Sequence, residues 1–191
     1  MSKNTNEVSQ RGSRVNSRHE FRDFLEGNRD CVEIKSTKTC KLYVQGRSGQ
    51  YTFTFDNIFG QQSSQNEMFS AVGIPTVDHL LSGVNSTILA YGPTGVGKTH
   101  TTLGDLHSDE MRGLAPRTFE HLFFMIEEEQ ATMTPAPEYR IVCSNVEIYN
   151  ETITDLLAPG STNLALRTGT EAGTFVEGLT QVEINSCKSL C

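Results

Sequence analysis

The chain has 191 residues and a mass of 21.1 kDa, the size of one domain with or without a tail. Its 16 Lys and Arg against 23 Asp and Glu give a net charge of −7, which argues against a general nucleic-acid-binding protein, because such domains carry a basic surplus. No apolar run approaches the roughly 18 residues of a membrane span, and no secretory signal is visible. The five scattered cysteines contain no Cys-x-x-Cys pair, so neither a disulfide framework nor a zinc site is expected, and a cytoplasmic setting fits best.

Acidic charge is concentrated in the C-terminal third. Residues 127–191 carry 10 acidic and 3 basic side chains, whereas residues 1–126 carry 13 of each. A solvated acidic face is the usual interpretation of such a run. An acidic partner would be repelled unless this face points away from it.

The first 20 residues are polar and are predicted to be mostly disordered, because they bury too little apolar surface to offset the entropy of ordering. Four arginines recur at helical spacing in this stretch and just after it: Arg11, Arg14, Arg18 and Arg22. They form either a solvated basic tail or an arm for an acidic partner or a phosphate. A transit peptide is disfavoured because the apolar face is thin. Residues 21–191 are then the folded domain.

Three strands are predicted at the start of that domain. Short apolar runs lie at 31–34 and 41–44, and residues 51–55 alternate between apolar and polar, which predicts a strand with one buried face. Asp56 and Asn57 are predicted to end this third strand.

Helical and strand patterns alternate through the middle of the chain. Apolar spacing over 65–82 predicts a helix that Pro75 kinks or breaks and that Gly83 ends. Residues 86–91, Ser-Thr-Ile-Leu-Ala-Tyr, are typical of a strand buried on both faces. Pro116 suits the first position of a following helix of about four turns.

The last third is predicted to be richer in strands. We expect a loop at 132–137, a long strand at 139–149, a short helix at 151–157, and a closing hairpin of 163–167 with 174–184. Strands that alternate with helices predict the α/β class.

The segment that carries chemistry is residues 92–99, Gly92-Pro93-Thr94-Gly95-Val96-Gly97-Lys98-Thr99, which fits the phosphate-binding loop pattern G-x-x-x-x-G-K-[ST]. Glycines let backbone N–H groups approach several anionic oxygens, and the helix that follows offers its positive end. Lys98 is predicted to contact the β- and γ-phosphates, and the Thr99 hydroxyl to bind Mg²⁺. The alternative is a Gly-rich turn with an incidental lysine.

Hydrolysis needs two further groups, an acid on the metal side and a group that orients the attacking water. Asp105, Asp109 and Glu110 follow the loop too closely to lie on a neighbouring strand. Glu147 lies inside a predicted strand, and Asp155 is separated from its strand by a predicted helix. The residues alone therefore predict a protein that binds ATP or ADP with Mg²⁺, without visible hydrolytic groups.

Four ordered motifs resemble the kinesin motor domain, over most of residues 51–184. They are Phe-Thr-Phe-Asp at 53–56, Ala-Tyr-Gly through Thr-His-Thr at 90–101, Arg-Gly-Leu-Ala-Pro-Arg at 112–117, and Glu-Ile-Tyr-Asn-Glu with Asp-Leu-Leu at 147–157. Residues 176–180 fit the strand that follows the last motif.

The resemblance implies a P-loop NTPase-type fold, a sheet flanked by helices, in an ATP-driven motor that moves along microtubules in the cytoplasm and belongs to the cytoskeleton. It implies ATP or ADP and Mg²⁺ as cofactors and places His100 beside the adenine. No nucleic-acid or membrane partner is expected.

The sequence also departs from the family pattern. Residues 14–18, Arg-Val-Asn-Ser-Arg, match the family's opening Arg-x-Arg-Pro only in part. The family's two switch motifs and most of its microtubule-binding surface would lie beyond Cys191, so the similarity covers the N-terminal part of a motor domain, which is truncated at its C-terminal side. The remaining tubulin-facing loop would be near 167–177, where Arg167 stands against Glu171 and Glu177, a poor match for an acidic filament.

Three functions remain open on this basis. The first is a kinesin-like motor, with ATP hydrolysis and movement belonging to the complete domain. The second is a non-motile module that binds nucleotide without turnover. The third is a partner that pairs with an intact motor through exposed sheet edges, which would also make the chain marginally stable by itself.

Overall fold

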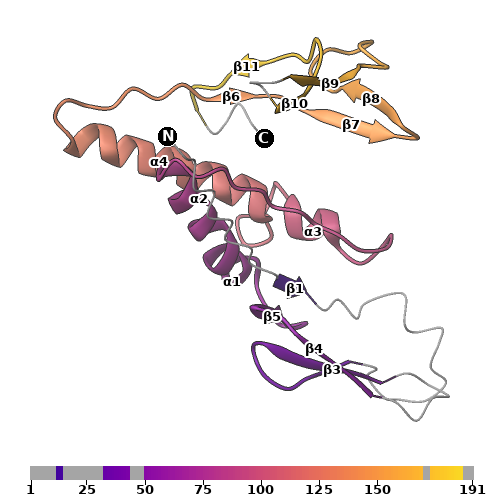
Figure 1. Ribbon diagram of the computed structural model, residues 1–191. Coiled ribbons are helices and arrows are strands. Elements are labelled where there is room, and N and C mark those ends of the chain that lie inside the picture. The colour runs from indigo at the N-terminus through magenta and orange to yellow at the C-terminus, as the bar shows by residue number, and fades with distance from the viewer. Residues whose placement is uncertain (1–11, 15–31, 44–49, 170–172, 187–191) are drawn as a thin grey trace. The chain divides into compact units, whose positions relative to one another are not determined.

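A computed structural model describes residues 12–14, 32–43, 50–169 and 173–186 (Figure 1). The chain divides into two compact units, Met1–Leu122 and Phe123–Cys191. Helices and strands are mixed, as predicted. Within the described residues, no helix has both the length and the apolar character that a membrane span requires.

Two small sheets lie at the start of the first unit. Strands β2 (Val32–Ile34), β3 (Thr39–Tyr43) and β4 (Gln50–Thr54) form an antiparallel sheet, which confirms the three predicted strands. Strand β5 (Asn57–Phe59) follows almost at once and pairs in parallel with β1 (Gly12–Arg14). Neither β1 nor β5 was predicted, because three residues are too few to show a period.

Strand β1 lies within the stretch that was predicted to be mostly disordered. Its neighbours in the chain, including Arg11, Arg18 and Arg22, lie outside the described residues. The expected disorder of that stretch and the expected boundary at residue 20 stay predictions.

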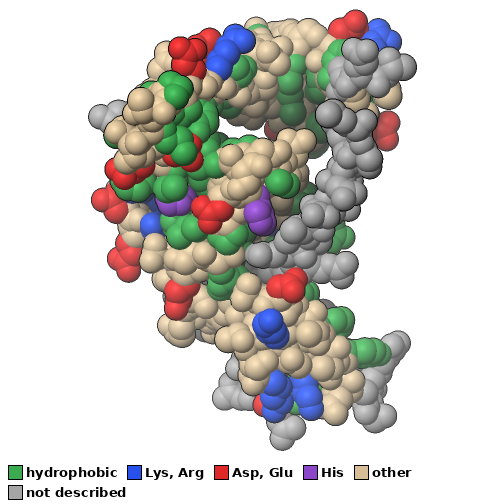
Figure 2. Space-filling view, turned by 60° about the vertical axis from the view of Figure 1, so that its left-hand side comes forward, with side chains coloured by type: hydrophobic (Ala, Val, Ile, Leu, Met, Phe, Trp, Pro, Cys, Tyr) green, Lys and Arg blue, Asp and Glu red, His purple; other side chains and the backbone are tan. Residues whose placement is uncertain are grey.

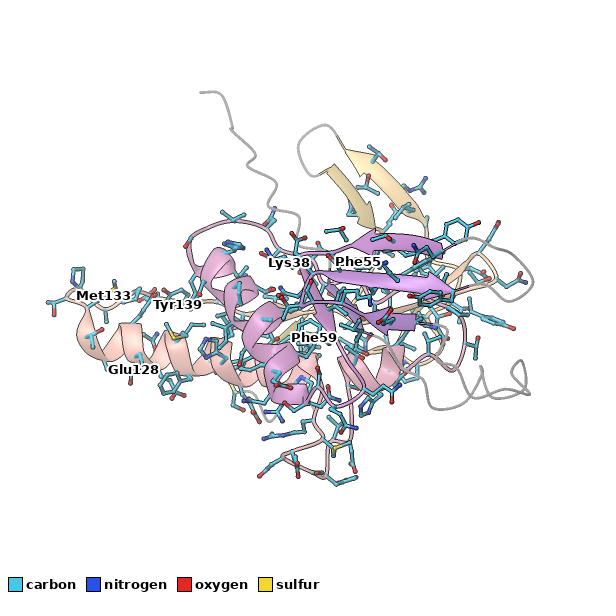
Figure 3. The ribbon with its side chains drawn as sticks, turned by 90° about the horizontal axis from the view of Figure 1, so that it is seen from below. Lys38, Phe55, Phe59, Glu128, Met133 and Tyr139 are labelled. Carbon is cyan, nitrogen blue, oxygen red and sulfur yellow. The ribbon has the colours of Figure 1, made fainter. Side chains whose placement is uncertain are left out.

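The prediction that β4 has a buried face was wrong. Phe53 lies opposite Cys40, and Tyr51 lies opposite Leu42, so the alternation does place these side chains on one face. Tyr51 and Phe53 are nevertheless 46% and 44% exposed, and in this sheet only Cys40 is buried. A period of two fixes which side chains share a face, whereas burial depends on what packs against that face. Figure 3 shows Lys38 beside Phe55, where the Phe55 N–H donates to the Lys38 carbonyl oxygen at 2.8 Å.

The helix predicted over 65–82 is present in three consecutive parts: α1 (Gln65–Met68), the π-helix η2 (Phe69–Gly73) and α2 (Ile74–Leu81). Ser64 and Glu67 form a reciprocal capping box at its start. Pro75 stands in the first turn of α2, directly after the π-helix, so the irregularity lies where the proline removes an N–H donor. Gly83 ends the helix with a φ of +81°, as predicted.

The core of the first unit joins β5, this helix and α4 (Leu114–Thr132). Phe59, Met68 and Leu114 are buried together, and Phe69, Ala71 and Val72 pack against them. At Gly73 an added Cβ would lie 2.3 Å from a ring carbon of Phe69, so only glycine fits there. The helix predicted after Pro116 is confirmed, although it begins two residues earlier and continues to Thr132.

The predicted strand at 86–91 is not formed, and the prediction that it is buried was wrong. Residues 84–91 have no regular secondary structure. Leu89 and Tyr91 are 83% and 94% exposed. A strand buried on both faces needs a hydrogen-bonded strand beside it and side chains above and below, and no strand in the described parts of the chain pairs with this segment.

The second unit consists of paired strands after the C-terminal part of α4. Strand β6 (Val142–Cys143) pairs with β11 (Val182–Glu183), β7 (Val146–Tyr149) with β8 (Thr152–Asp155), and β9 (Leu166–Gly169) with β10 (Gly173–Val176). All three pairs are antiparallel. The loop predicted at 132–137 is present, and Figure 3 shows Tyr139 returning alongside the end of α4, where its hydroxyl donates to Glu129.

Two predictions in this unit were wrong. The long strand at 139–149 is divided at residues 144–145 into β6 and β7. The helix at 151–157 is the strand β8, because Asn150 and Glu151 have φ values of 48° and 61° and turn the chain back on itself in a two-residue hairpin. The closing hairpin is confirmed as β9–β10, although the chain after Val176 leaves it to form β11 beside β6.

Candidate phosphate-binding site

The loop at 92–97 has the backbone shape that its glycines permit. Gly92, Gly95 and Gly97 have φ values of 149°, 86° and 91°. A Cβ on Gly92 would also lie 2.8 Å from the Val96 side chain. Side chains other than that of glycine would strain these turns, so the sequence permits a tight loop whose N–H groups can face one centre.

Lys98 closes this loop. It is the first residue of α3 (Lys98–Thr102), and its side chain is half-buried. Its Nζ donates to the carbonyl oxygens of Gly92 and Pro93, at 2.9 and 2.8 Å. An ammonium has three N–H donors, so one remains for an anion held over the loop. The Lys98 ammonium, which is predicted to contact phosphate, is therefore held in place at the loop.

Thr99, the predicted Mg²⁺ ligand, has an exposed side chain on α3. Its hydroxyl is a suitable ligand for a hard cation, but it is a single ligand. The described residues contain no group of three His, Cys, Asp or Glu side chains that could hold a metal by themselves. One protein hydroxyl fits a Mg²⁺ ion whose other ligands are phosphate oxygens and water molecules, which is how this ion is commonly bound.

His100 is held from the neighbouring helix by Gln65, which is 3% exposed. The Gln65 amide nitrogen lies 2.6 Å from the His100 carbonyl oxygen and 3.3 Å from its ring Nε2. The same nitrogen lies 3.4 Å from the Met111 carbonyl oxygen. Sequence reasoning missed Gln65, although its place on the helix face of Met68, Phe69 and Val72 was a usable signal, because a polar residue on an apolar face needs partners.

The acidic residues that follow α3 belong to a closed loop at 104–113. The Gly113 N–H donates to the Leu103 carbonyl oxygen at 2.8 Å, and an added Cβ on Gly104 would lie 2.1 Å from the Met111 carbonyl oxygen. Asp105 accepts from the His107 N–H within the loop. Arg117 of α4 donates to three of the loop's carbonyl oxygens, those of Asp109, Glu110 and Arg112, at 2.5 to 3.1 Å.

Arg112 fixes the same loop through charge. Its guanidinium pairs with Glu120 of α4 and lies 3.1 Å from Asp109. The Asp109 carboxylate and the carbonyl oxygens of Asp109 and Glu110 therefore help to fix this loop through Arg112 and Arg117. That neither residue is a metal-side acid stays a prediction.

Asp155 has a structural position in the second unit. Its side chain is 1% exposed, Oδ1 accepts from the Leu157 N–H, and Oδ2 accepts from the Thr180 N–H, each at 2.8 Å. Hydrogen bonds from Thr180 lower the pKa of this carboxyl, and the backbone N–H groups of Leu157 and Ala158 add to the effect. Glu147 is exposed on β7.

The segment expected to face tubulin is the β9–β10 hairpin. Arg167 Nε lies 2.9 Å from Glu177 Oε2, and both side chains are 58% exposed. Glu171 lies outside the described residues. The single basic side chain of this hairpin among the described residues is therefore already paired.

Known proteins resemble the chain over almost its whole length. A family model of the kinesin motor domain matches residues 3–191. Kinesin-like protein KIN-12B of Arabidopsis thaliana is 44% identical over 149 residues, which are 74% of this chain and 11% of that protein. Kinesin-like protein KIN-12D of the same plant is 38% identical over 183 residues, or 93% of this chain and 6% of that protein.

A solved structure agrees with these relatives. The structure of a fast kinesin, described for its ATPase mechanism and its interactions with microtubules, matches with a TM-score of 0.82 and 33% identity. The match covers 94% of this chain and 49% of the solved chain, so the chain spans about half of that kinesin and a small share of the longer relatives. The α/β, P-loop NTPase-type fold is thereby confirmed, and the chain belongs to the kinesin motor-domain family.

Proposed function

We propose that residues 92–100 bind the phosphates and base of ATP or ADP together with Mg²⁺, as part of a kinesin-like motor. The observation that carries this proposal is the Lys98 ammonium, which lies on the carbonyl oxygens of Gly92 and Pro93 inside a glycine-shaped loop. The nucleotide's phosphates would contact Lys98 and the backbone N–H groups of residues 94–98. Mg²⁺ would be held by the Thr99 hydroxyl, phosphate oxygens and water.

The roles of the residues follow from charge and geometry. Lys98 neutralises oxygens at the β- and γ-phosphates, and the loop excludes water from their inner side. Bound Mg²⁺ would supply charge neutralisation between neighbouring phosphates. His100 would border the base, on the opposite side of α3 from Lys98, because two residues along a helix turn the side chain by about 200°.

Turnover and movement are proposed for a complete motor domain. ATP hydrolysis coupled to movement along microtubules, in the cytoplasm as part of the cytoskeleton, fits the family. Within residues 1–191, binding without turnover is the second candidate. It is favoured because Asp105, Asp109 and Asp155 are each engaged in local structure.

Equilibrium binding of a fluorescent ATP analogue with Mg²⁺ tests the proposal. Lys98→Ala is expected to weaken binding about 10- to 100-fold, because a charge-assisted hydrogen bond to phosphate contributes roughly 1.5–3 kcal/mol. Lys38→Ala removes the same charge from an exposed position and should leave affinity unchanged. Equal affinity in the wild type and Lys98→Ala would refute the site. Phosphate release, with and without microtubules, then separates a motor from a binding module.

A further inference from the structure

Gln65 is the buried polar side chain nearest the candidate site that the proposed function does not explain. It begins α1, in a different segment from the phosphate-binding loop, and its amide nitrogen reaches two carbonyl oxygens and one ring nitrogen. A polar group that is 3% exposed with this many acceptors ties together three segments: α1, α3 and the loop at 104–113.

The surroundings fix which end of the amide faces His100. Carbonyl oxygens of His100 and Met111 lie 2.6 and 3.4 Å from Gln65 Nε2, and a carbonyl oxygen can only accept. The opposite orientation would bring the amide oxygen against both of them. The NH₂ group therefore points toward His100 and Met111, with one hydrogen on the His100 carbonyl oxygen and the other near His100 Nε2 and the Met111 carbonyl oxygen.

This orientation determines the state of the His100 ring. The NH₂ group is a donor without acceptor capacity, so it favours the tautomer in which the ring nitrogen beside it, His100 Nε2, is the unprotonated acceptor. The neutral ring then carries its hydrogen on Nδ1. Gln65 thus favours one tautomer and, through its contact with Nε2, one rotation of the ring, while its bond to the His100 carbonyl oxygen holds the backbone of α3.

We propose that Gln65 is a positioning residue for the nucleotide base, acting through the tautomer and rotation of His100. The inference rests on the proposed function, in which residues 92–99 hold phosphate and His100 borders the base. Lys98 and Thr99 would contact the phosphates, so a change at Gln65 is expected to alter recognition of the base more than recognition of phosphate alone.

Nitrogen-15 NMR of the histidine rings tests the tautomer without any nucleotide. The His100 signals, assigned by their loss in His100→Asn, should show a protonated Nδ1 and an unprotonated Nε2. Gln65→Leu removes the donor and should give a mixture of tautomers. Gln65→Glu keeps the size, offers an acceptor and should move the hydrogen to Nε2. A wild-type ring protonated at Nε2, or an unchanged tautomer in both variants, would overturn the proposal.

Binding of ATP and of inorganic tripolyphosphate tests the consequence for the base. Gln65→Leu is expected to weaken ATP binding about fivefold and to leave tripolyphosphate binding within about twofold, as loss of one buried hydrogen bond predicts. Gln62→Leu is the matched control, since Gln62 is exposed in the turn before α1. Thermal melts identify a variant that fails to fold, and Gln65→Met, which removes the donor and keeps the length of the side chain, then provides the comparison.

The binding results distinguish a failure of the role of Gln65 from a failure of the proposed nucleotide-binding function. A wild-type chain that binds neither ATP nor tripolyphosphate refutes the proposed function and the base role together. Wild-type binding of both ligands, with an unchanged ratio of the two affinities in Gln65→Leu and Gln65→Glu, overturns the role of Gln65 alone. A lower ATP affinity with an unchanged tripolyphosphate affinity supports it.

Discussion

Asp155 shows how one side chain can organise a unit that has few buried residues. Its two oxygens accept N–H groups from Leu157 and Thr180, which are far apart in the sequence. The carboxyl thus joins the end of β8 to the segment before β11. Hydrogen bonds that favour the charged form lower its pKa, so the folded state holds this group ionised more strongly than the unfolded chain does.

Acid is therefore expected to remove stability that Asp155 provides. The folded pKa lies below the unfolded value of about 3.9, so the stabilisation is fully present above that value. It is lost as the pH falls through the lower folded pKa. Asp155→Asn should lower the melting temperature at pH 7 and flatten its decline between about pH 5 and pH 2.

Thermal unfolding across that pH range, followed by circular dichroism, measures the effect. Glu138→Gln, at an exposed position in the same unit, is the control and should match the wild type. Identical melting curves for the wild type and Asp155→Asn at pH 7 would show that these hydrogen bonds do not stabilise the unit.

At the scale of elements, the turn between β7 and β8 carries a local conflict. Asn150 and Glu151 both have positive φ, which is the shape that a two-residue hairpin requires. Asn tolerates this region and Gly prefers it, whereas Glu is strained there. The cross-strand pair of Ile148 with Ile153 lies just beyond the turn, and the ladder continues to Val146 opposite Asp155.

Glu151→Gly is therefore expected to stabilise the hairpin. The change creates an Asn-Gly turn and removes the strain of a non-glycine residue in the left-handed region. The free energy of unfolding is expected to rise by roughly 1 kcal/mol. Glu147→Gly supplies the opposite control, because glycine inside β7 weakens a strand. Urea denaturation measures both variants. A lower midpoint for Glu151→Gly would contradict the strained turn.

At the scale of the whole molecule, large apolar side chains are exposed within segments that have few partners. Leu89 and Tyr91 precede the phosphate-binding loop, and Ile148 and Tyr149 lie on β7, with exposures of 69% and 77% for the latter pair. Figure 2 shows hydrophobic side chains at the surface of the face that it presents. Exposed apolar segments and unpaired strand edges favour association.

The chain of residues 1–191 is accordingly expected to be marginally stable, to bind a hydrophobic dye and to self-associate as its concentration rises. Leu89→Lys should reduce both dye fluorescence and the associated fraction, because it replaces an exposed apolar side chain with a charge. Ser86→Lys adds the same charge without removing apolar surface and should have a smaller effect. Light scattering over a concentration series measures the association. A monomeric wild type with a sharp, reversible melt would contradict the expectation.

The elements that the sequence predicted correctly are those that strong local patterns encode. The helices at 65–82 and after Pro116 were predicted because long apolar periods, Pro116 and Gly83 all act within a few residues. Residues 92–99 were predicted to bind phosphate because a phosphate-binding loop is encoded by residue types at fixed spacing. Asp155 was excluded as a metal-side acid because a helix was predicted between it and its strand, and that reason was wrong, since Asp155 is the last residue of strand β8. Its structural role was not anticipated.

What tertiary structure decided was burial and pairing. Alternation at 51–55 predicted a strand, but whether its apolar face is covered depends on residues elsewhere. Residues 86–91 have the composition of a buried strand and are exposed, because a strand of that kind exists only with neighbours on both sides.

The sequence by itself determined the family and the main helices and predicted the phosphate-binding loop, since these depend on residue type and short spacing. Only the tertiary structure showed that 152–155 is a strand and that Gln65 contacts His100 from 35 residues away. Such contacts depend on how segments that are distant in the sequence pack together, and local patterns of hydropathy or turn residues do not encode that packing.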